Sequence, residues 1–365
     1  MDGPFTPKPA IHKTRLVINT PEGDPNFRSY PDRHNPTEYE IIQKQIDEWL
    51  ANKVVQESVS PWSSNIVLVR KADKKARVAI DYRKLNKVTK KDAYMLPRVD
   101  QVFDVMHDMK FVSVTDCHSA FLQVPIDDPR TRELTAFVTP NGGLYEFMRC
   151  PFGLVNAPAV WQRLIDEVLG GYKWKFVLAY VDDICVFTKS ANIDDHLADL
   201  DKVFDRLDKY GLSAKASKTL LAHKELPFLG HIIGVDGIKP DPSKVKAMAD
   251  TKPPTDLKTL RSVLGRFSYY RKFVKSFANI AAPLIGLLSR EVKKKKGEPY
   301  LNDEQLTSFE ALKKAMCTGP IVLAHPDWSR PFEVHTDGAL EGIGAVLCQK
   351  TEKGDCQKID YENSF

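Results

Sequence analysis

Two adjacent carboxylates interrupt an apolar stretch of this 365-residue chain, KFVLAYVDDICVFTK, from Lys175 to Lys189. Burying a charge costs far more free energy than burying a methylene group gains, so a lone carboxylate is rare in such a place. Two neighbouring carboxylates raise each other's pKa and add to that cost. The stretch predicts two strands, Phe176–Tyr180 and Ile184–Phe187, whose connection holds Asp182 and Asp183, because Asp tolerates the backbone geometry of a turn.

A hairpin that presents two carboxylates from an apolar stem is stable when a cation neutralises them. Nucleotidyl and phosphoryl transfer use such carboxylates with two metal ions about 3.5–4 Å apart. Oxygen ligands alone favour Mg²⁺. Two adjacent residues cannot surround both ions, so a third carboxylate must come from another strand, and Asp116 at the end of FVSVT is the candidate. Taken alone, the Asp182–Asp183 pair is more often an ordinary hairpin turn. Asp116 alone is likewise more often a strand-end residue that bonds to nearby backbone.

The composition is that of an ordinary globular protein, with 42% hydrophobic and 28% charged residues. No apolar stretch approaches the length of a membrane span, and the first residues contain no apolar signal core. The cysteines are scattered without a CxxC pair, which argues against a zinc site and a disulfide framework and favours a reducing, intracellular setting. The six are Cys117, Cys150, Cys185, Cys317, Cys348 and Cys356.

Basic charge gathers in two segments although the net charge is only +5. Residues 51–100 carry 12 Lys and Arg against 5 Asp and Glu, and residues 258–296 carry 11 against 1. Such segregation predicts two basic surfaces that face a polyanion such as nucleic acid. Solvated faces that keep the protein soluble are the alternative, and charge alone leaves both open.

Helical and strand patterns alternate without a βαβ rhythm, so the expected class is α+β. A Pro-rich, charged arm or linker is expected over residues 1–35, and helices over 36–55 and after Pro158. Further along, 225–240 predicts a hairpin and 331–350 predicts two strands joined by a Gly-rich turn. From Thr255 onward an apolar helical stripe opposes Arg and Lys. Its members are Leu260, Leu264, Phe267, Tyr270, Val274 and Phe277.

Several motifs together resemble reverse transcriptases, most closely those of gypsy-type LTR retrotransposons. YVDD lies within apolar strands, DCHSAF precedes it and PFGLVNAP lies between them. SPWSSNIVLVRK, RVAIDYRKLN, LPRVD, LPFLGH, LRSVLGRFSYYRKFV and IAAPL follow the same order and spacing. The resemblance extends from about His12 to Gln349, and the ending KTEKGDCQKIDYENSF looks unlike the family.

The resemblance implies a right-hand polymerase fold with fingers, palm and thumb, followed by an incomplete α/β segment similar to RNase H. The implied domains are an arm at 1–35, fingers and palm at 36–239, a thumb at 240–292, a linker or connection at 293–330 and the RNase H-like segment at 331–365. Protease and integrase motifs are absent, which would make the chain one segment of a larger polyprotein.

The resemblance also assigns roles to single residues. Asp116, Asp182 and Asp183 are the implied catalytic metal ligands, helped by the backbone carbonyl of Cys117. Phe121 is the implied aromatic gate beneath the sugar, which selects dNTPs over rNTPs, although a core aromatic is the ordinary interpretation. The other implied residues are Lys71, Arg77, Phe152 and Gly153 for nucleotide binding, Phe228, Leu229 and Gly230 for the primer end, and Asp337 as a first RNase H carboxylate. Arg70, Lys74 and Lys75 compete with Lys71.

The implied activity is RNA-directed and DNA-directed DNA synthesis from a primer 3′-hydroxyl with two Mg²⁺ ions, for which Mn²⁺ would substitute. The implied partners are an RNA or DNA template with primer, dNTPs, other Pol and Gag products and a second copy in a homodimer, without a membrane. The expected location is a cytoplasmic virus-like particle, with nuclear entry of the complex. No RNase H activity is expected of this chain alone. A catalytically silent nucleic-acid-binding protein and a nuclease built around Asp337 are the alternatives.

Overall fold

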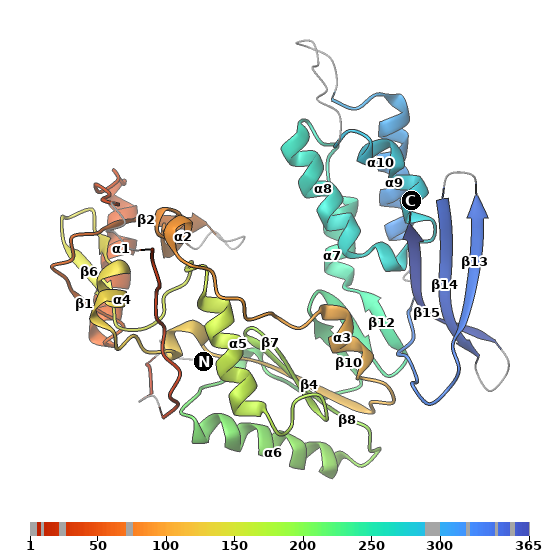
Figure 1. Cartoon of the computed structure of the whole chain (residues 1–365), viewed down its shortest axis with the longest axis horizontal. Coiled ribbons are helices and arrows are strands. Elements are labelled where there is room, and N and C mark those ends of the chain that lie inside the picture. Colours follow the sequence, from red (N-terminus) through yellow and green to blue (C-terminus); the bar gives the residue numbers. More distant parts are fainter. Residues whose placement is uncertain are drawn as a thin grey trace. The chain divides into compact units, whose positions relative to one another are not determined.

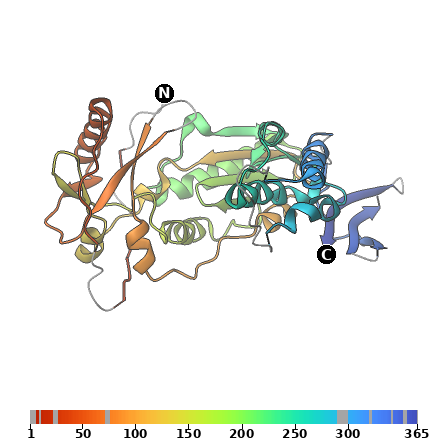
Figure 2. The ribbon, with the colours of Figure 1, turned by 90° about the horizontal axis from the view of Figure 1, so that it is seen from above.

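The computed structural model describes residues 6–8, 11–21, 27–70, 76–288, 300–318, 322–339, 342–350 and 355–364. The chain divides into two compact units. The first comprises Met1–Pro97, Ser113–Val186 and Asp194–Leu221, and the second comprises Arg98–Val112, Phe187–Ile193 and Ala222–Phe365. Each unit is described by itself. Figures 1 and 2 show the elements of both in two views.

The first unit opens with an N-terminal segment that packs into its core. Leu16, Ile18 and Phe27 are buried, and the backbone N–H of Leu16 donates to the carbonyl of Pro125 at 3.1 Å. The arm expected over residues 1–35 is therefore anchored in the unit over this part. Helix α1 (Pro36–Ala51) follows, with Asn35 and Glu38 forming a capping box at its start.

A five-stranded sheet of the first unit has the order β1-β6-β5-β2-β3. Strands β2 and β3 form an antiparallel hairpin, which Figure 2 shows in orange. Strand β5 pairs in parallel with β2 and antiparallel with β6. The bounds are β1 (Val55–Glu57), β2 (Ser64–Arg70), β3 (Ala76–Ile80), β5 (Phe137–Val138) and β6 (Leu144–Phe147).

The acidic hairpin belongs to a four-stranded sheet of order β7-β8-β4-β9. Its central strands, β8 and β4, are almost fully buried, and helices α5 and α6 lie beside the sheet (Figure 1). Trp161, Leu164 and Ile165 of α5 are each fully buried. The bounds are β4 (Phe111–Asp116), β7 (Val177–Tyr180), β8 (Asp183–Thr188), β9 (Leu220–His223), α5 (Ala157–Leu169) and α6 (Ile193–Lys209).

Short elements complete this part of the chain. The 3₁₀ turn η1 (Ala120–Gln123) follows β4, and η2 (Ala216–Lys218) precedes β9. Helix α4 (Pro129–Leu134) begins after Asp128, whose carboxylate accepts from the backbone of Thr131. The remaining short helices are α2 (Arg83–Val88) and α3 (Val99–Asp104), the second of which belongs to the second unit.

In the second unit, β10 (Glu225–Phe228), β11 (His231–Gly234) and β12 (Gly237–Pro240) form an antiparallel meander, which confirms the predicted hairpin. Helices α7 (Pro242–Ala249) and α8 (Leu257–Tyr269) follow. The apolar stripe predicted from Thr255 is buried, but it does not form one helix. Tyr270 leaves the helical region, η3 (Arg271–Phe273) intervenes, and Ser276 takes φ +56° before α9 (Phe277–Ile285) begins.

Helix α10 (Asp303–Cys317) lies within the stretch expected to be a linker, and it packs against α9 and α7. Strands β13 (Glu333–Ala339), β14 (Gly342–Lys350) and β15 (Cys356–Ser364) form an antiparallel sheet whose strands lie side by side in Figure 1. The first two strands confirm the prediction, and β15 was not predicted. Cys348 and Cys356 form a disulfide across β14 and β15, so the expectation of unpaired cysteines was wrong for this pair.

Helices and mostly antiparallel strands are thus mixed in both units, as the α+β class requires. Within the part of the chain that the structure describes, no helix has the length and apolar character needed to span a lipid bilayer.

Candidate active site

The acidic pair lies in a tight turn between β7 and β8. Tyr180 pairs with Asp183, which leaves Val181 and Asp182 as the two loop residues. Val181 takes φ +51°, a left-handed conformation that is strained for a β-branched residue. Such strain persists only when surrounding structure holds it, and it is concentrated at functional sites. Asp182 therefore stands at the tip of the turn, and Asp183 is the first residue of β8.

Helix α5 holds this strained turn. The side chain of Gln162 accepts a hydrogen bond from the backbone N–H of Val181 at 2.9 Å and donates to the carbonyl of Ala179 at 3.2 Å. The indole N–H of Trp161 donates to the carbonyl of Val181 at 2.8 Å. Both side chains are fully buried, so the turn rests on a rigid support. The helix was predicted from the sequence, but these two residues were not singled out.

The sheet brings Asp116 to the same turn. Strand β4 lies next to β8 and ends at Asp116. The following residue, Cys117, donates its backbone N–H to the carbonyl of Asp182 at 2.9 Å. The structure therefore places Asp116, Asp182 and Asp183 in one group, as their predicted role requires.

The three carboxylates repel one another. The pKa of Asp182 is raised to about 6, first by burial and then by the charges of Asp116 and Asp183. The pKa of Asp183 is raised by burial and by Asp116. The Oδ1 atom of Asp182 is buried and has no hydrogen-bond partner among the described residues. This oxygen is suited to bind a cation. A buried oxygen without a hydrogen-bond partner is destabilising, and a metal ion bound to it would remove that free-energy cost.

Lys218 is a member of the site that the sequence did not indicate. Its ammonium group forms an ion pair with the Oδ2 atom of Asp116 at 2.5 Å. Turn η2 positions it, since the backbone N–H of Lys215 donates to the carbonyl of Asp116 at 2.8 Å. The charge of Lys218 opposes the rise in the pKa of Asp182 and Asp183. Lys218 lies 102 residues beyond Asp116 in the sequence, so only the fold brings them together.

The residues predicted to bind a nucleotide also meet in the first unit. The rings of Phe121 and Phe152 lie 5.2 Å apart, and the guanidinium of Arg77 lies 5.7 Å from the centre of the Phe152 ring. Gly153 takes φ +97°, and its carbonyl accepts from the side chain of Asn86 at 2.8 Å. Arg77 and Phe152 line a cavity of about 250 Å³. Lys71, Lys74 and Lys75 lie outside the described residues.

In the second unit, Leu229 and Gly230 form the turn between β10 and β11, directly after Phe228 at the end of β10. Phe228 is buried, whereas Leu229 and Gly230 take φ values of +47° and +74°. The hydroxyl of Tyr269 donates to the carbonyl of Leu229, and that of Tyr270 donates to the carbonyl of Gly230, both at 2.8 Å. Two adjacent tyrosines therefore fix this turn from the end of α8.

His231 supports the same turn. Its Nδ1 atom lies 2.9 Å from the carbonyl oxygen of Leu229. Burial lowers the pKa of His231 to about 4, helped by the charge of Lys272, so the imidazole is neutral at pH 7. Asp337 occupies a position on β13 opposite Gly344. Its side chain lies outside the described residues, so its predicted role stays a prediction.

Comparisons with known proteins agree with the motifs. Residues 69–233 match the family described as reverse transcriptase (RNA-dependent DNA polymerase). Residues 301–363 match the RNase H-like domain found in reverse transcriptase. The second match continues to residue 363, so the family resemblance extends beyond Gln349, where it was expected to end.

Relatives among retrotransposon proteins cover nearly the whole chain. The Pol polyprotein of transposon opus from Drosophila melanogaster is 37% identical over 353 residues, which are 93% of this chain and 34% of the relative. That of transposon gypsy from the same organism is 34% identical over 92% of this chain and 33% of the relative. The chain thus spans about a third of the length of these relatives. The gypsy-type resemblance is confirmed.

Solved structures show the same fold. A foamy viral protease-reverse transcriptase in complex with RNA/DNA hybrid has a TM-score of 0.81 and 24% identity, and covers 97% of this chain and 46% of its own. The complex of the foamy viral protein with dsDNA has a TM-score of 0.82 at 24% identity, over 97% of this chain and 71% of its own. The right-hand polymerase fold is therefore confirmed.

Proposed function

Residues 69–233 belong to the reverse transcriptase family, and on that premise we propose that the chain is an RNA-directed and DNA-directed DNA polymerase that extends a primer 3′-hydroxyl with dNTPs. The observation that carries the proposal is the strained turn at Val181. It holds Asp182, whose buried Oδ1 atom has no hydrogen-bond partner among the described residues, beside Asp116 and Asp183. Several carboxylates are brought together at such cost where cations neutralise them.

The carboxylates fit Mg²⁺, which prefers oxygen ligands and takes substrate phosphates as further ligands. Asp116, Asp182 and Asp183 would hold two ions, with the backbone carbonyl of Cys117 as a further donor, and Mn²⁺ would substitute. Bound there, the cations supply Lewis-acid stabilisation of the charge that develops during nucleotidyl transfer. The ammonium of Lys218 pairs with Asp116, and we propose that a metal ion bound by Asp116 would displace it.

The aromatic pair of the first unit would bind the sugar. A ring of Phe121 beneath the C2′ atom leaves no room for a 2′-hydroxyl, and the contact with Phe152 at 5.2 Å restrains the ring. Arg77 would bind the triphosphate, because its planar guanidinium suits phosphate oxygens. Its position over the Phe152 ring orients it. Gly153 would complete this wall, and Lys71 stays assigned to the triphosphate from the resemblance alone.

Helix α8 offers a surface for the duplex. Its buried face consists of Leu260, Val263, Leu264 and Phe267, and its exposed face carries Lys258, Arg261 and Arg266. Basic side chains on one face bind phosphates without reading base identity. The foamy viral relatives were solved with RNA/DNA hybrid and with dsDNA, which supports a primer–template duplex as the partner of this chain. The turn of Phe228, Leu229 and Gly230 would hold the primer end.

Further partners rest on the family resemblance of the sequence alone. We propose that the chain works with other Pol and Gag products, as part of a larger polyprotein, and pairs as a homodimer. A cytoplasmic virus-like particle with later nuclear entry is the proposed location.

Primer extension on an RNA template with dNTPs and Mg²⁺ tests the proposal. The parent should extend the primer, and the double variant Asp182→Asn/Asp183→Asn should bind the same duplex without extending it. A folded parent that binds primer–template but never extends it would favour the catalytically silent binding protein. Degradation of the RNA strand without extension would favour a nuclease instead.

A further inference from the structure

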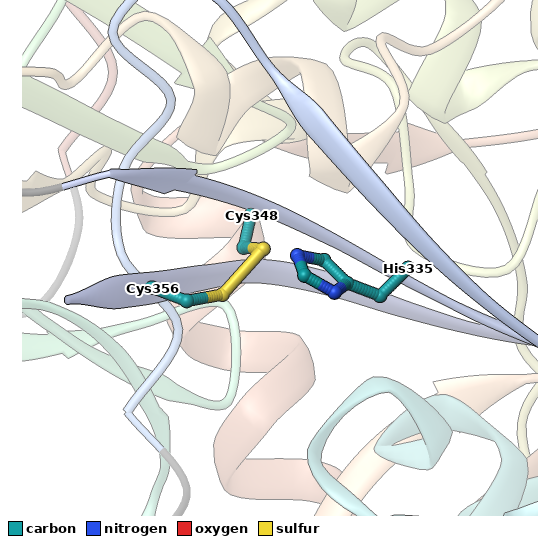
Figure 3. A group of neighbouring side chains, drawn as sticks. All are labelled: His335, Cys348 and Cys356. Carbon is teal, nitrogen blue, oxygen red and sulfur yellow. A yellow bond between two sulfur atoms is a disulfide. The ribbon is translucent and has the colours of Figure 1, made fainter. Parts of the chain in front are cut away.

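The C-terminal sheet brings three soft metal ligands to one face. The sulfur atoms of Cys348 and Cys356 and a ring nitrogen of His335 all lie within 4.8 Å of one another. Figure 3 shows the imidazole of His335 directed at the two sulfur atoms. Cys348 is buried, whereas His335 and Cys356 are exposed. The group is therefore anchored in the sheet on one side and open to solution on the other.

Strand pairing explains why residues scattered in the sequence meet here. Strand β14 is the central strand: Glu333 of β13 pairs with Cys348, and Cys356 of β15 pairs with Lys350. Side chains two residues apart on a strand share a face of the sheet. His335 therefore lies on the same face as Glu333, and Cys348 lies on the same face as Lys350. The register of β14 and β15 shifts between Leu347 and Cys348, and such an irregularity re-aims side chains.

Two cysteines and one histidine form a ligand set that is typical of zinc. Thiolates select soft or borderline ions such as Zn²⁺ over Mg²⁺. The fourth position has a natural candidate in Glu333, whose carboxylate lies 3.6 Å from the Nε2 atom of His335. We propose that, when its two thiols are reduced, this sheet binds one zinc ion through His335, Cys348, Cys356 and Glu333.

The charges at the site balance. Binding of Zn²⁺ to two thiols and a neutral imidazole releases two protons to solvent and leaves two thiolates on the metal. With the Glu333 carboxylate the site then carries one negative charge. The ammonium of Lys350 lies 2.7 Å from Glu333 and neutralises it.

The disulfide in this structure is the oxidised form of the same two thiols. Oxidation of the two thiols by one hydrogen peroxide forms the Cys348–Cys356 bond and two water molecules. It removes both thiolates, so zinc must leave. A reductant that returns the thiols restores the ligands. Metal and disulfide thus exclude each other at this site, and the redox state of the surroundings selects between them.

Zinc content of the full chain tests the proposal, and the readout is independent of polymerase activity. The reduced protein is loaded with Zn²⁺ under nitrogen, freed of excess metal and analysed for bound zinc. The parent should hold about one equivalent more zinc than the Cys356→Ser variant. Cys317→Ser removes an exposed free cysteine of α10 and should bind as the parent does. Circular dichroism checks that each variant is folded.

Co²⁺ in place of Zn²⁺ identifies the ligands by absorption. Thiolate-to-cobalt charge-transfer bands should appear in the parent and in Cys317→Ser, and disappear in Cys356→Ser and after hydrogen peroxide. His335→Ala and Glu333→Gln should each raise the Kd for zinc on the order of tenfold or more. Equal zinc in the parent and Cys356→Ser, or bands that survive peroxide, would overturn the site. An unchanged Kd in Glu333→Gln would overturn the fourth ligand.

Discussion

Replacement of Asp182 by Asn should make the metal-free protein more stable while it abolishes polymerisation. The pKa of Asp182 is raised to about 6, so the folded state binds this proton more tightly than the unfolded state does. Stability therefore falls as the pH rises from the unfolded value of 3.8 to about 6, and it stays low above that pH. Asn keeps the shape of the side chain without the charge, so it removes this penalty at neutral pH.

The size of the pKa shift of Asp182 determines how much stability the substitution should gain. A rise from 3.8 to about 6 corresponds to at most about 3 kcal/mol, since one pKa unit is about 1.4 kcal/mol. The site is partly open to solvent, and screening reduces this to roughly 1–2 kcal/mol. For a unit of this size, that gain in the free energy of unfolding raises the melting temperature by roughly 2–8 °C. Saturating Mg²⁺ should close the gap, because it stabilises the parent more than the variant.

Scanning calorimetry at pH 4 and pH 7.5, with and without Mg²⁺, measures these differences. The advantage of Asp182→Asn should appear at pH 7.5 and be largely absent at pH 4. Asp128→Asn is the matched control in the same unit. The hydroxyl and backbone of Thr131 hold the pKa of Asp128 below its usual value, so loss of that charge should not stabilise the protein. A variant no more stable than the parent at pH 7.5, or equally favoured at pH 4, would refute the reasoning.

Four further substitutions test other parts of the structure. Phe121→Ala should raise use of rNTPs relative to dNTPs by roughly tenfold or more in primer extension, and an unchanged ratio would place the gate elsewhere. Tyr270→Phe removes the hydrogen bond to Gly230 and should lower the free energy of unfolding by about 1 kcal/mol. It should also raise KM for primer–template more than KM for dNTP, and equal changes in the two KM values would show that this turn does not bind the primer. Gly237→Ala should cost about 3 kcal/mol or more by calorimetry, because its Cβ would lie 2.2 Å from the Leu323 carbonyl oxygen at φ +130°; a loss below about 1 kcal/mol would contradict this contact. Gly265→Ala adds a methyl group in open space on α8 and should stabilise the protein by about 0.5–1 kcal/mol, and destabilisation would contradict the exposure of that face.

Local patterns predicted the elements that carry the site. The apolar runs on either side of Asp182 and Asp183 predicted the two strands, and Pro36 with Thr37 marked the start of α1. These signals lie within a few residues of one another, so the sequence alone can reveal them.

Long-range partners could not be predicted in the same way. Lys218 reaches Asp116 only because η2 is bonded to the end of β4. Strand β15 had a usable signal, since Ile359 and Tyr361 alternate with polar residues, but its high polarity hid it. The pairing of Cys348 with Cys356 could not be predicted without that strand. The apolar stripe predicted from Thr255 does not form one helix, because the backbone leaves helical geometry at Tyr270 and again at Ser276 although the stripe itself is buried.

The burial of Leu16 has a consequence for how the first unit acquires its structure. This residue leaves the ribosome early, yet the carbonyl that it binds belongs to Pro125, which is synthesised more than a hundred residues later. Contacts of such high sequence separation are slow to form and leave apolar side chains exposed in the meantime. A fragment that begins at residue 69, where the family match begins, would lack the apolar side chains that this segment adds to the core. Such a fragment should therefore require solubilising partners or aggregate during synthesis, whereas a chain that keeps the segment completes the core with its own residues.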